Sequence, residues 1–572
     1  MLRTVSRRHL LRLGLTGLGG IALGLACAPA PPATKPADAP KPAEAPKPAQ
    51  PAAATAAPPP AAATAAPPPA AATAAPPAAA AATAAATSAP AVKTAVSGKI
   101  VIMLGADPPE LNAVLHSAGQ IRNPTQDNIF EGLLTVDTEM KLLPNLATSW
   151  ERIDATRMRF KLQSGVKFHN GEPFNADAVV ASVKRVVDPE ARASVISYLD
   201  TLAGAEAQDP QTVDIITKGP DPIVQRRMSF LMIGPTEILT KSPDTLTDKP
   251  IGTGPYRFVE WSKGQRLILQ ANDEYWGPRK PTIKEVEYQP RKEATVRVTA
   301  IKAGEAHVAE SIGPEDAGTL PTEQIVSGLM VEGMQLRPTV IRGLTADARV
   351  RRAISHSIDR ETLIKSIYGQ YGEMPNGQVF GRTSFAYDTT MRDIPFDLEQ
   401  AKALLKEAGA EGKELTIIGN ATDRYVKFRE VQEAVAGMIG KTGLKVNLKL
   451  LEPAEWLKAL RDVKDPPQDL WFGGAGNEMQ DPDRIYAAYL KTGGPSAVYS
   501  SPEMDKLFDA SRAELDSTKR AALLAEIARK IQDETLLIPL IQLHQIYAIS
   551  TKLKFEMYPS GIMPVARMQL LS

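Results

Sequence analysis

Short runs typical of β-strands dominate the chain from about residue 98 to about residue 340. In several of them apolar and polar residues alternate, which is the period of a strand with one buried face. These runs predict strands at residues 99–104, 150–151, 157–162, 213–217 and 284–288. The valines of residues 175–187 instead recur with the spacing of one helical face. We therefore expect a helix there, with Asn175 or Asp177 as its N-terminal cap.

A hairpin is predicted directly after the sequence IGTGPY at residues 251–256. Its two strands are residues 257–261 and 266–270. The turn between them contains Gly264. The glycines and the proline of IGTGPY restrict the backbone, because glycine tolerates positive φ and proline fixes its own φ. Tyr256 and the pair Tyr275 and Trp276 are expected to anchor the hairpin on a larger sheet. We interpret this segment as scaffold that holds no ligand.

From about residue 350, segments with the hydrophobic period of a helix alternate with segments typical of strands. This order of elements is typical of an α/β domain. Helices are predicted around residues 350–358, 397–408, 431–439 and 518–533, and strands at residues 415–418, 444–450 and 536–542. The second of these helices has clear boundary signals, because Asp397 and Gln400 resemble a capping box and Gly409 supplies the stop. A further strand at residues 469–472 is expected to lead into a glycine-rich loop.

Length, charge and cysteine content restrict the function classes. A chain of 572 residues is too long for a single core, so two or three domains are expected. The formal net charge of +1 leaves no basic footprint for nucleic acid. The single cysteine, Cys27, lies in the leader, and the six histidines form no HxxxH or HxH pair, so we expect no disulfide, no metal site and no cofactor. Walker A, HExxH and GxSxG motifs are absent from the sequence, which argues against an enzyme.

The first 97 residues predict export, attachment and a spacer. Residues 1–27 have the basic, apolar and small residues of a secretory signal, and the arginine pair resembles the twin-arginine type, with Sec export left open. The sequence LGLAC resembles a lipoprotein cleavage site in which Cys27 carries the lipid. The alternative is an ordinary cleaved signal with an incidental cysteine. Residues 28–97 are rich in proline and alanine and are expected to form a disordered stalk.

Several motifs occur together in one order over most of the chain. They are LPNLATSWE at residues 143–151, FKL at 160–162, GVKFHNGEPFNADAV at 165–179, IGTGPY at 251–256, NDEYWG at 272–277, AGE at 303–305, VRRAI at 350–354 with IDR at 358–360, the segment 499–505, and IPL at 538–540. With the leader and linker, these motifs resemble the extracytoplasmic solute-binding proteins, family 5, of peptide- and nickel-type ABC importers. The resemblance implies an α/β, two-lobed periplasmic-binding-protein-like fold of type II, with an extra subdomain and a hinge.

The resemblance also implies domain limits and partners. Lobe I would comprise residues 98–335 and 540–572, with the extra subdomain at about 140–245, and lobe II would comprise residues 336–540. A solute would be captured between the closing lobes and delivered to an ABC permease and its ATPase subunits. The receptor would be an extracytoplasmic monomer, at the cell surface or in the periplasm, with a lipid anchor in the membrane and no nucleic-acid partner.

An oligopeptide is the ligand that this resemblance favours. A nickel chelate, an opine-like compound and an oligosaccharide are the alternatives. The scarce histidines argue mildly against nickel, and an aromatic content of 5% argues mildly against a platform for sugars. Two hypotheses of another class also fit an exported chain. An exported hydrolase would turn over peptides or glycosides, and a surface adhesin would bind surfaces without being stabilised by a soluble ligand.

The best candidate site is the segment DLWFGGAGNEMQDPD at residues 469–483. Glycines let a ligand approach backbone amides, and Trp471 and Phe472 offer flat apolar surface. In peptide-binding relatives, an aspartate four residues before the proline of this segment pairs with the α-ammonium group of the ligand. That position is Glu478 in this chain. We therefore predict Glu478 and its neighbour Asn477 as ligand contacts, and a solvated loop acid is the alternative interpretation of Glu478.

Three further predictions concern individual side chains. Asp107 lies early in lobe I, where relatives place a loop that faces the cleft, and it is a candidate ligand contact. Asp481 is expected to cap a helix whose first turn contains Pro482. Three aromatic residues either line the cleft or lie in a core, and we favour the core: Trp456, Tyr486 and Tyr489.

Overall fold

The computed structural model describes residues 97–422 and 425–571. These described residues belong to one compact unit. The predicted signal, the lipid-carrying Cys27 and the proline–alanine segment lie outside the described residues. What the sequence indicates about these N-terminal segments therefore stays a prediction.

The described chain contains one large sheet and three small ones. Neighbouring strands of the large sheet are β15 (Lys445–Leu451), β14 (Glu414–Asn420), β16 (Leu470–Gly476), β12 (Ile325–Pro338), β17 (Ile538–Ile549), β11 (Val308–Ala309), β1 (Ser97–Leu104), β10 (Ile283–Pro290), β9 (Arg266–Ala271) and β8 (Tyr256–Ser262), with β13 (Gly372–Glu373) paired to β17. The first small sheet has the strand order β4 (Ala147–Arg152), β5 (Arg157–Leu162), β7 (Thr212–Thr217) and β6 (Leu202–Asp209). The second pairs β2 (Leu134–Val136) with β3 (Leu142–Pro144), and the third pairs β18 (Leu553–Lys554) with β19 (Gln569–Leu570).

Helices surround these sheets. Those before β12 are α1 (Gly119–Thr125), α2 (Ala176–Val187), α3 (Ile196–Leu199), α4 (Val224–Arg227), α5 (Thr236–Lys241), α6 (Thr245–Asp248), α7 (Ala294–Ala303) and α8 (Pro314–Ala317). Those after β12 are α9 (Ala348–His356), α10 (Arg360–Ile367), α11 (Leu398–Glu407), α12 (Phe428–Gly440), α13 (Pro453–Arg461), α14 (Asp483–Tyr489), α15 (Pro502–Ala513) and α16 (Ser517–Asp533).

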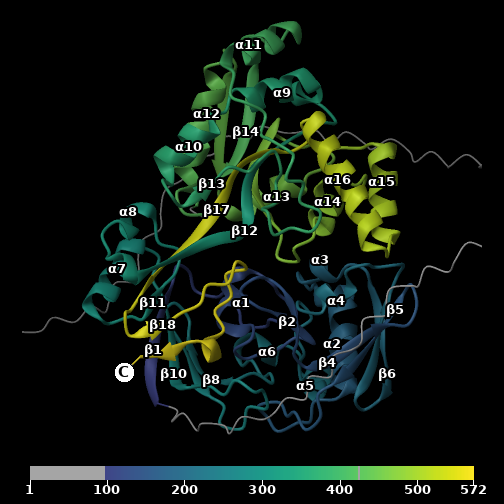
Figure 1. The fold of residues 1–572 in the computed structure, drawn as a ribbon, viewed down its shortest axis with the longest axis vertical. Helices are drawn as coiled ribbons and strands as arrows, with labels where there is room; N and C mark the ends of the chain where they lie inside the picture. Colours follow the sequence, from purple (N-terminus) through teal and green to yellow (C-terminus); the bar gives the residue numbers. More distant parts are fainter. Residues whose placement is uncertain (1–96, 423–424, 572) are drawn as a thin grey trace, which may run out of the picture. The chain divides into compact units, whose positions relative to one another are not determined.

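Two long strands join the parts of the large sheet. β12 has 14 residues and β17 has 12, and the two pair with each other in antiparallel orientation. β17 also pairs with β11 at one end and with β13 further along, while the C-terminal half of β12 pairs with β16. Figure 1 shows both strands passing between the elements around β14 and those around β1. Their register shifts between Leu329 and Gly333, so regular pairing is interrupted near the middle of β12.

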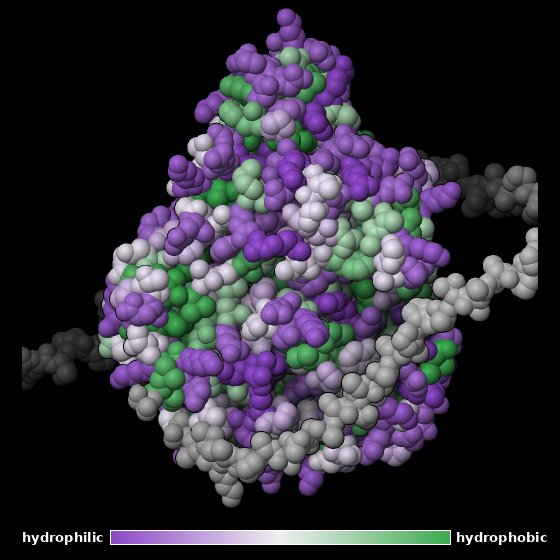
Figure 2. Space-filling view, in the orientation of Figure 1, coloured by the Kyte–Doolittle hydropathy of each residue, from purple (hydrophilic) through white to green (hydrophobic). Residues whose placement is uncertain are grey.

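Separate hydrophobic cores lie at the two ends of these strands. One core gathers side chains from β1, β5, β7 and β10, such as Ile102, Phe160 and Val286, and we call the elements around it the β1 lobe. The elements around β14 and β16 form the β14 lobe. In this lobe, α9 to α12 cover one face of the sheet and α14 to α16 cover the other. In the view of Figure 2, hydrophilic residues cover most of the described surface, with smaller apolar groups between them. The result is a mixed α/β fold with two lobes.

Most elements predicted from the periodicity are confirmed. The hairpin is formed by β8 and β9, and the predicted helix at residues 175–187 is α2. Asn175 caps α2, because its side chain accepts a hydrogen bond from the Ala178 N–H. Asp397 caps α11 in the same way by accepting from the Gln400 N–H, and Gly409 follows that helix with a left-handed φ of 60°.

Some predicted boundaries are wrong. β16 continues through Gly473 and Gly474, which we expected in a loop. A Cβ atom on Gly473 would overlap the Trp471 ring, so this glycine allows close packing within a strand. β17 continues to Ile549, well beyond the predicted end at residue 542. The prediction missed this part because both faces of the strand are largely buried, so the polar–apolar alternation that marks a half-exposed strand is absent. α9 ends at His356, before the predicted end at residue 358.

The IGTGPY segment is held by close backbone contact rather than by unusual φ angles. The N–H groups of Gly254 and Tyr256 donate to the carbonyl oxygens of Ile129 and Asn128 at 2.9 and 2.8 Å. A Cβ atom on Gly252 or Gly254 would overlap those same carbonyl groups, and neither glycine has a positive φ. Our expectation that positive φ explains these glycines is therefore wrong. The backbone needs glycine here because nothing larger fits.

The predicted aromatic anchors converge on one buried carboxylate, Glu131. It is 2% exposed and accepts hydrogen bonds from the Tyr275 hydroxyl at 2.7 Å, the Trp276 indole at 2.8 Å and the Thr253 hydroxyl at 2.8 Å. Burial raises the pKa of Glu131 to about 7, although these three donors oppose the increase. The motif IGTGPY and the segment at 272–277 are therefore joined through a residue that the sequence did not single out.

The raised pKa of Glu131 predicts a stability that depends on pH. Between about pH 4.5 and 7 the folded chain keeps a proton on Glu131 that the unfolded chain has released, so the stability of the folded state falls as the pH rises through this window. Glu131→Gln removes the titration. We expect the wild type to lose up to about 3 kcal/mol relative to this variant between pH 5 and pH 8.

Urea unfolding followed by circular dichroism at several pH values checks this expectation. Glu323→Gln serves as the control, because Glu323 is an exposed carboxylate in the same lobe. Parallel pH profiles for the wild type and Glu131→Gln would contradict the assignment.

Candidate ligand-binding site

The segment between β16 and α14, residues 477–482, lies where the two lobes meet. Met479 is 1% exposed and packs into the core of the β1 lobe, although β16 and α14 belong to the β14 lobe. The turn is fixed by Asn477, whose Nδ2 donates to Ser384 Oγ at 2.8 Å and whose Oδ1 accepts from the Asp481 N–H at 2.7 Å. The side chain of Asn477, a predicted ligand contact, is thus used within the protein.

Glu478, the predicted partner of a ligand ammonium group, already has a cationic neighbour. Arg484 Nη2 lies 2.9 Å from Glu478 Oε2 and also donates to the Gly476 carbonyl oxygen at 2.6 Å. Burial favours a higher pKa for Glu478, but Arg484 and Arg122 outweigh it, so the pKa lies below its usual value and the carboxylate is ionised. Glu478 is therefore a half-buried anion that is neutralised in part by an arginine six residues further along the chain.

The Glu478–Arg484 pair rests on an aromatic stack of the β1 lobe. The Arg484 guanidinium lies over the Tyr198 ring at 4.4 Å, and the Tyr198 hydroxyl is hydrogen-bonded to Glu478. Tyr198 stacks on Phe230 with ring centroids 4.3 Å apart and an interplanar angle of 7°. Arg122 lies over the Phe230 ring at 5.0 Å. The structure therefore brings one carboxylate and two guanidinium groups together at the boundary of the lobes.

A partly buried network of charges forms a second contact between the lobes. Arg227 of the β1 lobe pairs with Asp221 at 2.8 Å, with Asp200 at 3.0 Å and with Asp483 of the β14 lobe at 2.7 Å. Arg512 of the β14 lobe pairs with Asp483 at 2.6 Å and with Asp200 at 2.8 Å. Burial favours a raised pKa for Asp483, but the two arginines outweigh it and hold the pKa at about 2. Each lobe thus supplies one arginine and one aspartate to the other.

In the sequence, only an indirect signal points to this network. Asp481-Pro482-Asp483 predicted a helix start, and α14 does begin at Asp483, with Pro482 in the capping position. Asp481 accepts from the Asp483 N–H at 3.0 Å and forms a bidentate pair with Arg520 at 2.6 and 2.8 Å. The pairs between the lobes, Arg227–Asp483 and Arg512–Asp200, join residues 256 and 312 positions apart, so they could not be inferred from one sequence.

The two predicted apolar contacts, Trp471 and Phe472, lie on opposite faces of β16. Phe472 is 0% exposed and packs against Phe428 in the core beneath α12, with ring centroids 5.6 Å apart. Trp471 is 1% exposed and packs against Trp456 at 4.5 Å on the other face. The structure does not bring these two rings together with Glu478. The favoured core position is confirmed for three aromatic residues, all less than 10% exposed: Trp456, Tyr486 and Tyr489.

Asp107, the remaining predicted contact, is attached to the hairpin. Its carboxylate accepts from the Gly264 N–H at 2.8 Å and from the Trp261 indole at 3.4 Å. These bonds hold the turn of β8 and β9 against the end of β1. Asp107 thus stabilises the segment that carries the IGTGPY motif, and the structure does not group it with Glu478.

Arg337, near the end of β12, was not singled out from the sequence. It is 2% exposed and lies between the rings of Trp471 and Tyr489, at 5.3 and 4.9 Å from their centroids. Its Nη1 donates to the Ser496 carbonyl oxygen, and its Nε and Nη2 have no hydrogen-bond partner. The sequence around it, MQLRPTV, contains one arginine in an apolar run. Nothing in this run predicts that the arginine is buried beside two aromatic rings with unpaired nitrogens.

The described residues contain neither a cluster of metal ligands nor a helix suited to crossing a membrane. Within residues 97–422 and 425–571, no three His, Cys, Asp or Glu side chains come together as a metal site would require. In the same residues, no helix combines the length and the hydrophobicity needed to cross a bilayer.

Comparisons with known proteins identify similar chains. Residues 141–497 match the family described as bacterial extracellular solute-binding proteins, family 5 Middle. The di/tripeptide-binding protein 2 of Pseudomonas aeruginosa is 28% identical over 438 residues, which cover 70% of this chain and 81% of that protein. The glutathione-binding protein GsiB of Pectobacterium atrosepticum is 25% identical over 419 residues, which cover 71% of this chain and 81% of that protein.

The fold also has a solved counterpart. The periplasmic binding protein DppA of Helicobacter pylori, in complex with the peptide STSA, superimposes with a TM-score of 0.72 at 24% identity and covers 84% of this chain and 99% of that chain. The two-lobed periplasmic-binding-protein fold inferred from the sequence is thereby confirmed.

Removal of the shared carboxylate of the charge network gives a testable expectation. Asp483→Asn leaves the guanidinium groups of Arg227 and Arg512 without the anion between them, so we expect the free energy of unfolding to fall by about 3 kcal/mol or more at neutral pH. Because the folded pKa lies below the unfolded value, this contribution is complete above about pH 4 and is lost as the pH falls toward 2.

Urea unfolding of the wild type and the variant from pH 7.5 downward measures the difference. Asp188→Asn is the control, because Asp188, directly after α2, forms a half-buried pair with Arg185 alone, and its loss is expected to change stability by about 1 kcal/mol or less. Equal effects of the two substitutions would show that the network does not stabilise the folded state.

Proposed function

Because the chain belongs to family 5 of the bacterial extracellular solute-binding proteins, we propose that the solute it captures for an ABC importer is an oligopeptide. The chain is a substrate-binding receptor, as its relatives are. Two of those relatives are named for di- and tripeptides and for glutathione, which supports a peptide-like ligand. The ATPase and the channel of the importer are other chains in this proposal. A nickel chelate, an opine or an oligosaccharide is the alternative cargo.

One observation carries the peptide proposal: the ionised Glu478 at the boundary of the lobes. A carboxylate has about four lone-pair positions, and Arg484, Tyr198 and the backbone N–H of Glu478 itself use three of them. The remaining position suits one N–H of the α-ammonium group of a peptide. Because Arg484 already shares the charge of Glu478, we expect the ammonium contact to contribute less than an unpaired carboxylate would.

Closure of the lobes about the β12–β17 crossing is the motion that we propose for capture. In this proposal lobe I comprises residues 98–335 and 540–572, with an extra subdomain at about 140–245, and lobe II comprises residues 336–540. Arg227 keeps Asp221 when the lobes part, and Arg512 keeps Asp483. Opening therefore leaves neither arginine without a carboxylate, which keeps the energetic difference between the open and closed states small enough for a ligand to shift.

Mass spectrometry of ligands that co-purify with the receptor, followed by a thermal-shift screen of di-, tri- and tetrapeptides, tests the proposal. A peptide at 100 times its dissociation constant adds about 2.7 kcal/mol to the stability of the folded state. Glu478→Gln is expected to weaken peptide binding by about tenfold or more, because the amide lacks the charge that attracts the ammonium group. Glu433→Gln, an exposed acid on α12, is the control and should bind as the wild type does.

Other results of this screen would contradict the proposal. Stabilisation by chelates, opines or sugars without peptides would favour the alternative cargo. Turnover of peptides or glycosides would favour an exported hydrolase, and surface binding without any stabilising solute would favour an adhesin. Unchanged peptide affinity in Glu478→Gln would remove Glu478 from the ammonium site and leave the receptor function standing.

We also propose that the receptor is an extracytoplasmic monomer held at the membrane through a lipid on Cys27. The sequence LGLAC and the proline–alanine segment after it support a tethered receptor on a stalk. Cys27→Ser is expected to move the protein from the membrane fraction to the soluble extracytoplasmic fraction in cells that process lipoproteins. Fractionation and metabolic labelling with a fatty-acid analogue measure this. Membrane attachment that survives the substitution would contradict lipidation.

A further inference from the structure

Arg337 differs from five other buried arginines of the described chain in how its nitrogens are used. Arg297, Arg351 and Arg360 direct their Nε and Nη atoms at backbone carbonyl or side-chain hydroxyl oxygens. Arg227 and Arg520 direct theirs largely at carboxylates. These contacts satisfy the donors of a group that is costly to bury. Among residues 97–422 and 425–571, only Ser496 accepts a hydrogen bond from Arg337, at Nη1, and no carboxylate pairs with it.

The two unused nitrogens of Arg337 lie on one edge of the guanidinium group. Nε and Nη2 each carry an N–H bond in the plane of the group, and the two bonds are parallel, so this edge matches the two oxygens of a carboxylate. Trp471 and Tyr489 cover the faces of the group. A partner must therefore approach in the plane, at the free edge. Burial lowers the pKa of Arg337 to about 10, so the group stays protonated at neutral pH.

Two more unpaired donors lie on the same face of the sheet as Arg337. Gln335 is two residues before Arg337 on β12, so the two side chains share one face of the strand, and the Gln335 amide is 0% exposed with no partner. The Trp471 indole nitrogen, on the strand position opposite Arg337, also has no partner. Gly473, opposite Gln335, adds no side chain to this face. The Gln335 amide oxygen is unpaired as well, so Gln335 can donate or accept, whereas Arg337 and the Trp471 indole can only donate. Because most of these unpaired groups are donors, they favour an anionic group from outside the chain.

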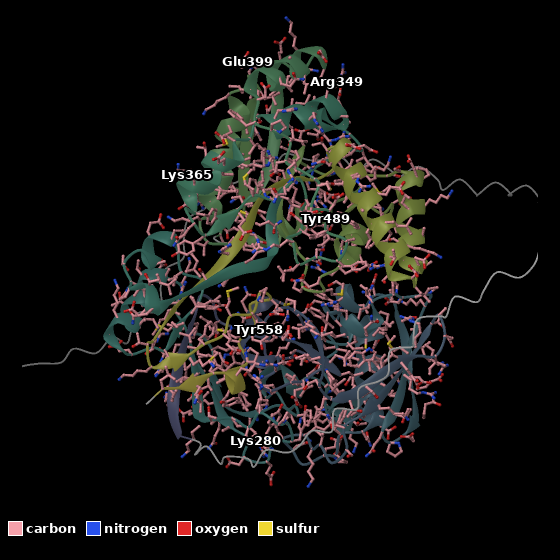
Figure 3. The ribbon with its side chains drawn as sticks, in the orientation of Figure 1. Lys280, Arg349, Lys365, Glu399, Tyr489 and Tyr558 are labelled. Carbon is pink, nitrogen blue, oxygen red and sulfur yellow. The ribbon has the colours of Figure 1, made fainter. Side chains whose placement is uncertain are left out.

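The site lies on one side of the sheet that joins the lobes. Figure 3 labels Tyr489, at the end of α14, on the opposite side of the β12–β17 sheet from Lys365 of α10. The Arg337 face of β12 is thus turned toward α13 and α14, whereas Leu336 on the other face packs in the core with α12. β12 also carries Glu332 next to Gly476, so one strand runs from the boundary of the lobes to Arg337.

We propose that the free edge of Arg337 binds a carboxylate group of the transported solute, with the Gln335 amide and the Trp471 indole as additional donors. This inference rests on the receptor function proposed above and specifies the ligand further: the solute carries a carboxylate that reaches the β14 lobe. Arg337 is then a residue that determines specificity. A neutral analogue leaves the charge unpaired, whereas the acid completes the hydrogen bonds of all three groups.

Replacement of Arg337 separates this role from a structural one. Arg337→Met keeps the volume and removes an unpaired buried charge, so the ligand-free variant is expected to unfold at the same temperature as the wild type or at a higher one. Arg351→Met is the matched control, because it removes an arginine whose donors are satisfied by the carbonyl oxygens of Thr345, Ala346 and Glu534, and it is expected to unfold at a lower temperature.

Paired acids and amides test the chemistry of the site on the purified full-length chain. The pairs are Ala-Ala-Ala-Ala and its C-terminal amide, Ala-Ala-Asp-Ala and Ala-Ala-Asn-Ala, and succinate and succinamide, at equal ionic strength. Calorimetry and thermal shift are the readouts. We expect the wild type to prefer the acid of at least one pair by roughly tenfold or more, and Arg337→Met to lose that preference.

Each outcome decides the proposal. The same acid-to-amide ratio in the wild type and in Arg337→Met, for every pair, overturns it and leaves the receptor function untouched. If no peptide binds, the oligopeptide proposal fails, and the succinate pair still decides whether Arg337 selects a carboxylate. Equal stabilisation by chloride and by succinate overturns the carboxylate assignment in favour of a small-anion site. A lower unfolding temperature for ligand-free Arg337→Met, equal to that of Arg351→Met, assigns Arg337 to the scaffold.

Discussion

The antiparallel pairing of β12 and β17 is the constraint on which the rest of the structure depends. These strands connect a sheet whose two ends serve different hydrophobic cores. Their backbone hydrogen bonds hold the connection, and the register shift after Leu329 interrupts the ladder between the cores. A two-strand crossing with an irregular centre resists separation of the lobes but bends more easily than a wide sheet. The same strand, β12, then carries Gln335 and Arg337 into the β14 lobe.

Charges are buried in this protein under three different conditions. Some arginines, such as Arg297 and Arg351, are enclosed by carbonyl oxygens and join segments of one lobe. Others, such as Arg227 and Arg512, meet carboxylates at the boundary of the lobes. Because desolvation offsets much of the attraction in a buried pair, these contacts bring the lobes together without fixing them permanently. Arg337 belongs to neither class, because its Nε and Nη2 have no hydrogen-bond partner in the described chain. This is the reason for our proposal that it binds a carboxylate of the solute.

The candidate site depends on contacts between the segment after β16 and the β1 lobe. Met479 packs into the opposite lobe, and Glu478 and Arg484 rest on Tyr198 and Phe230. Apolar burial, a cation–π contact and an ion pair therefore act within a few residues of each other. A ligand bound at Glu478 would contact the lobe boundary directly, so capture and closure would involve the same side chains.

The sequence by itself determined the local structure and the family. Periodicity and capping signals located α2, α11 and the β8–β9 hairpin, because these features depend on neighbours within a few residues. It missed the extent of β16 and β17, because glycines and continuous apolar runs carry no strand period. The family resemblance also pointed to Glu478, four residues before Pro482. Only the tertiary structure decided what Glu478, Asp483 and Arg337 contact. Their partners, or the lack of them, depend on packing between segments far apart in sequence, which no local pattern encodes.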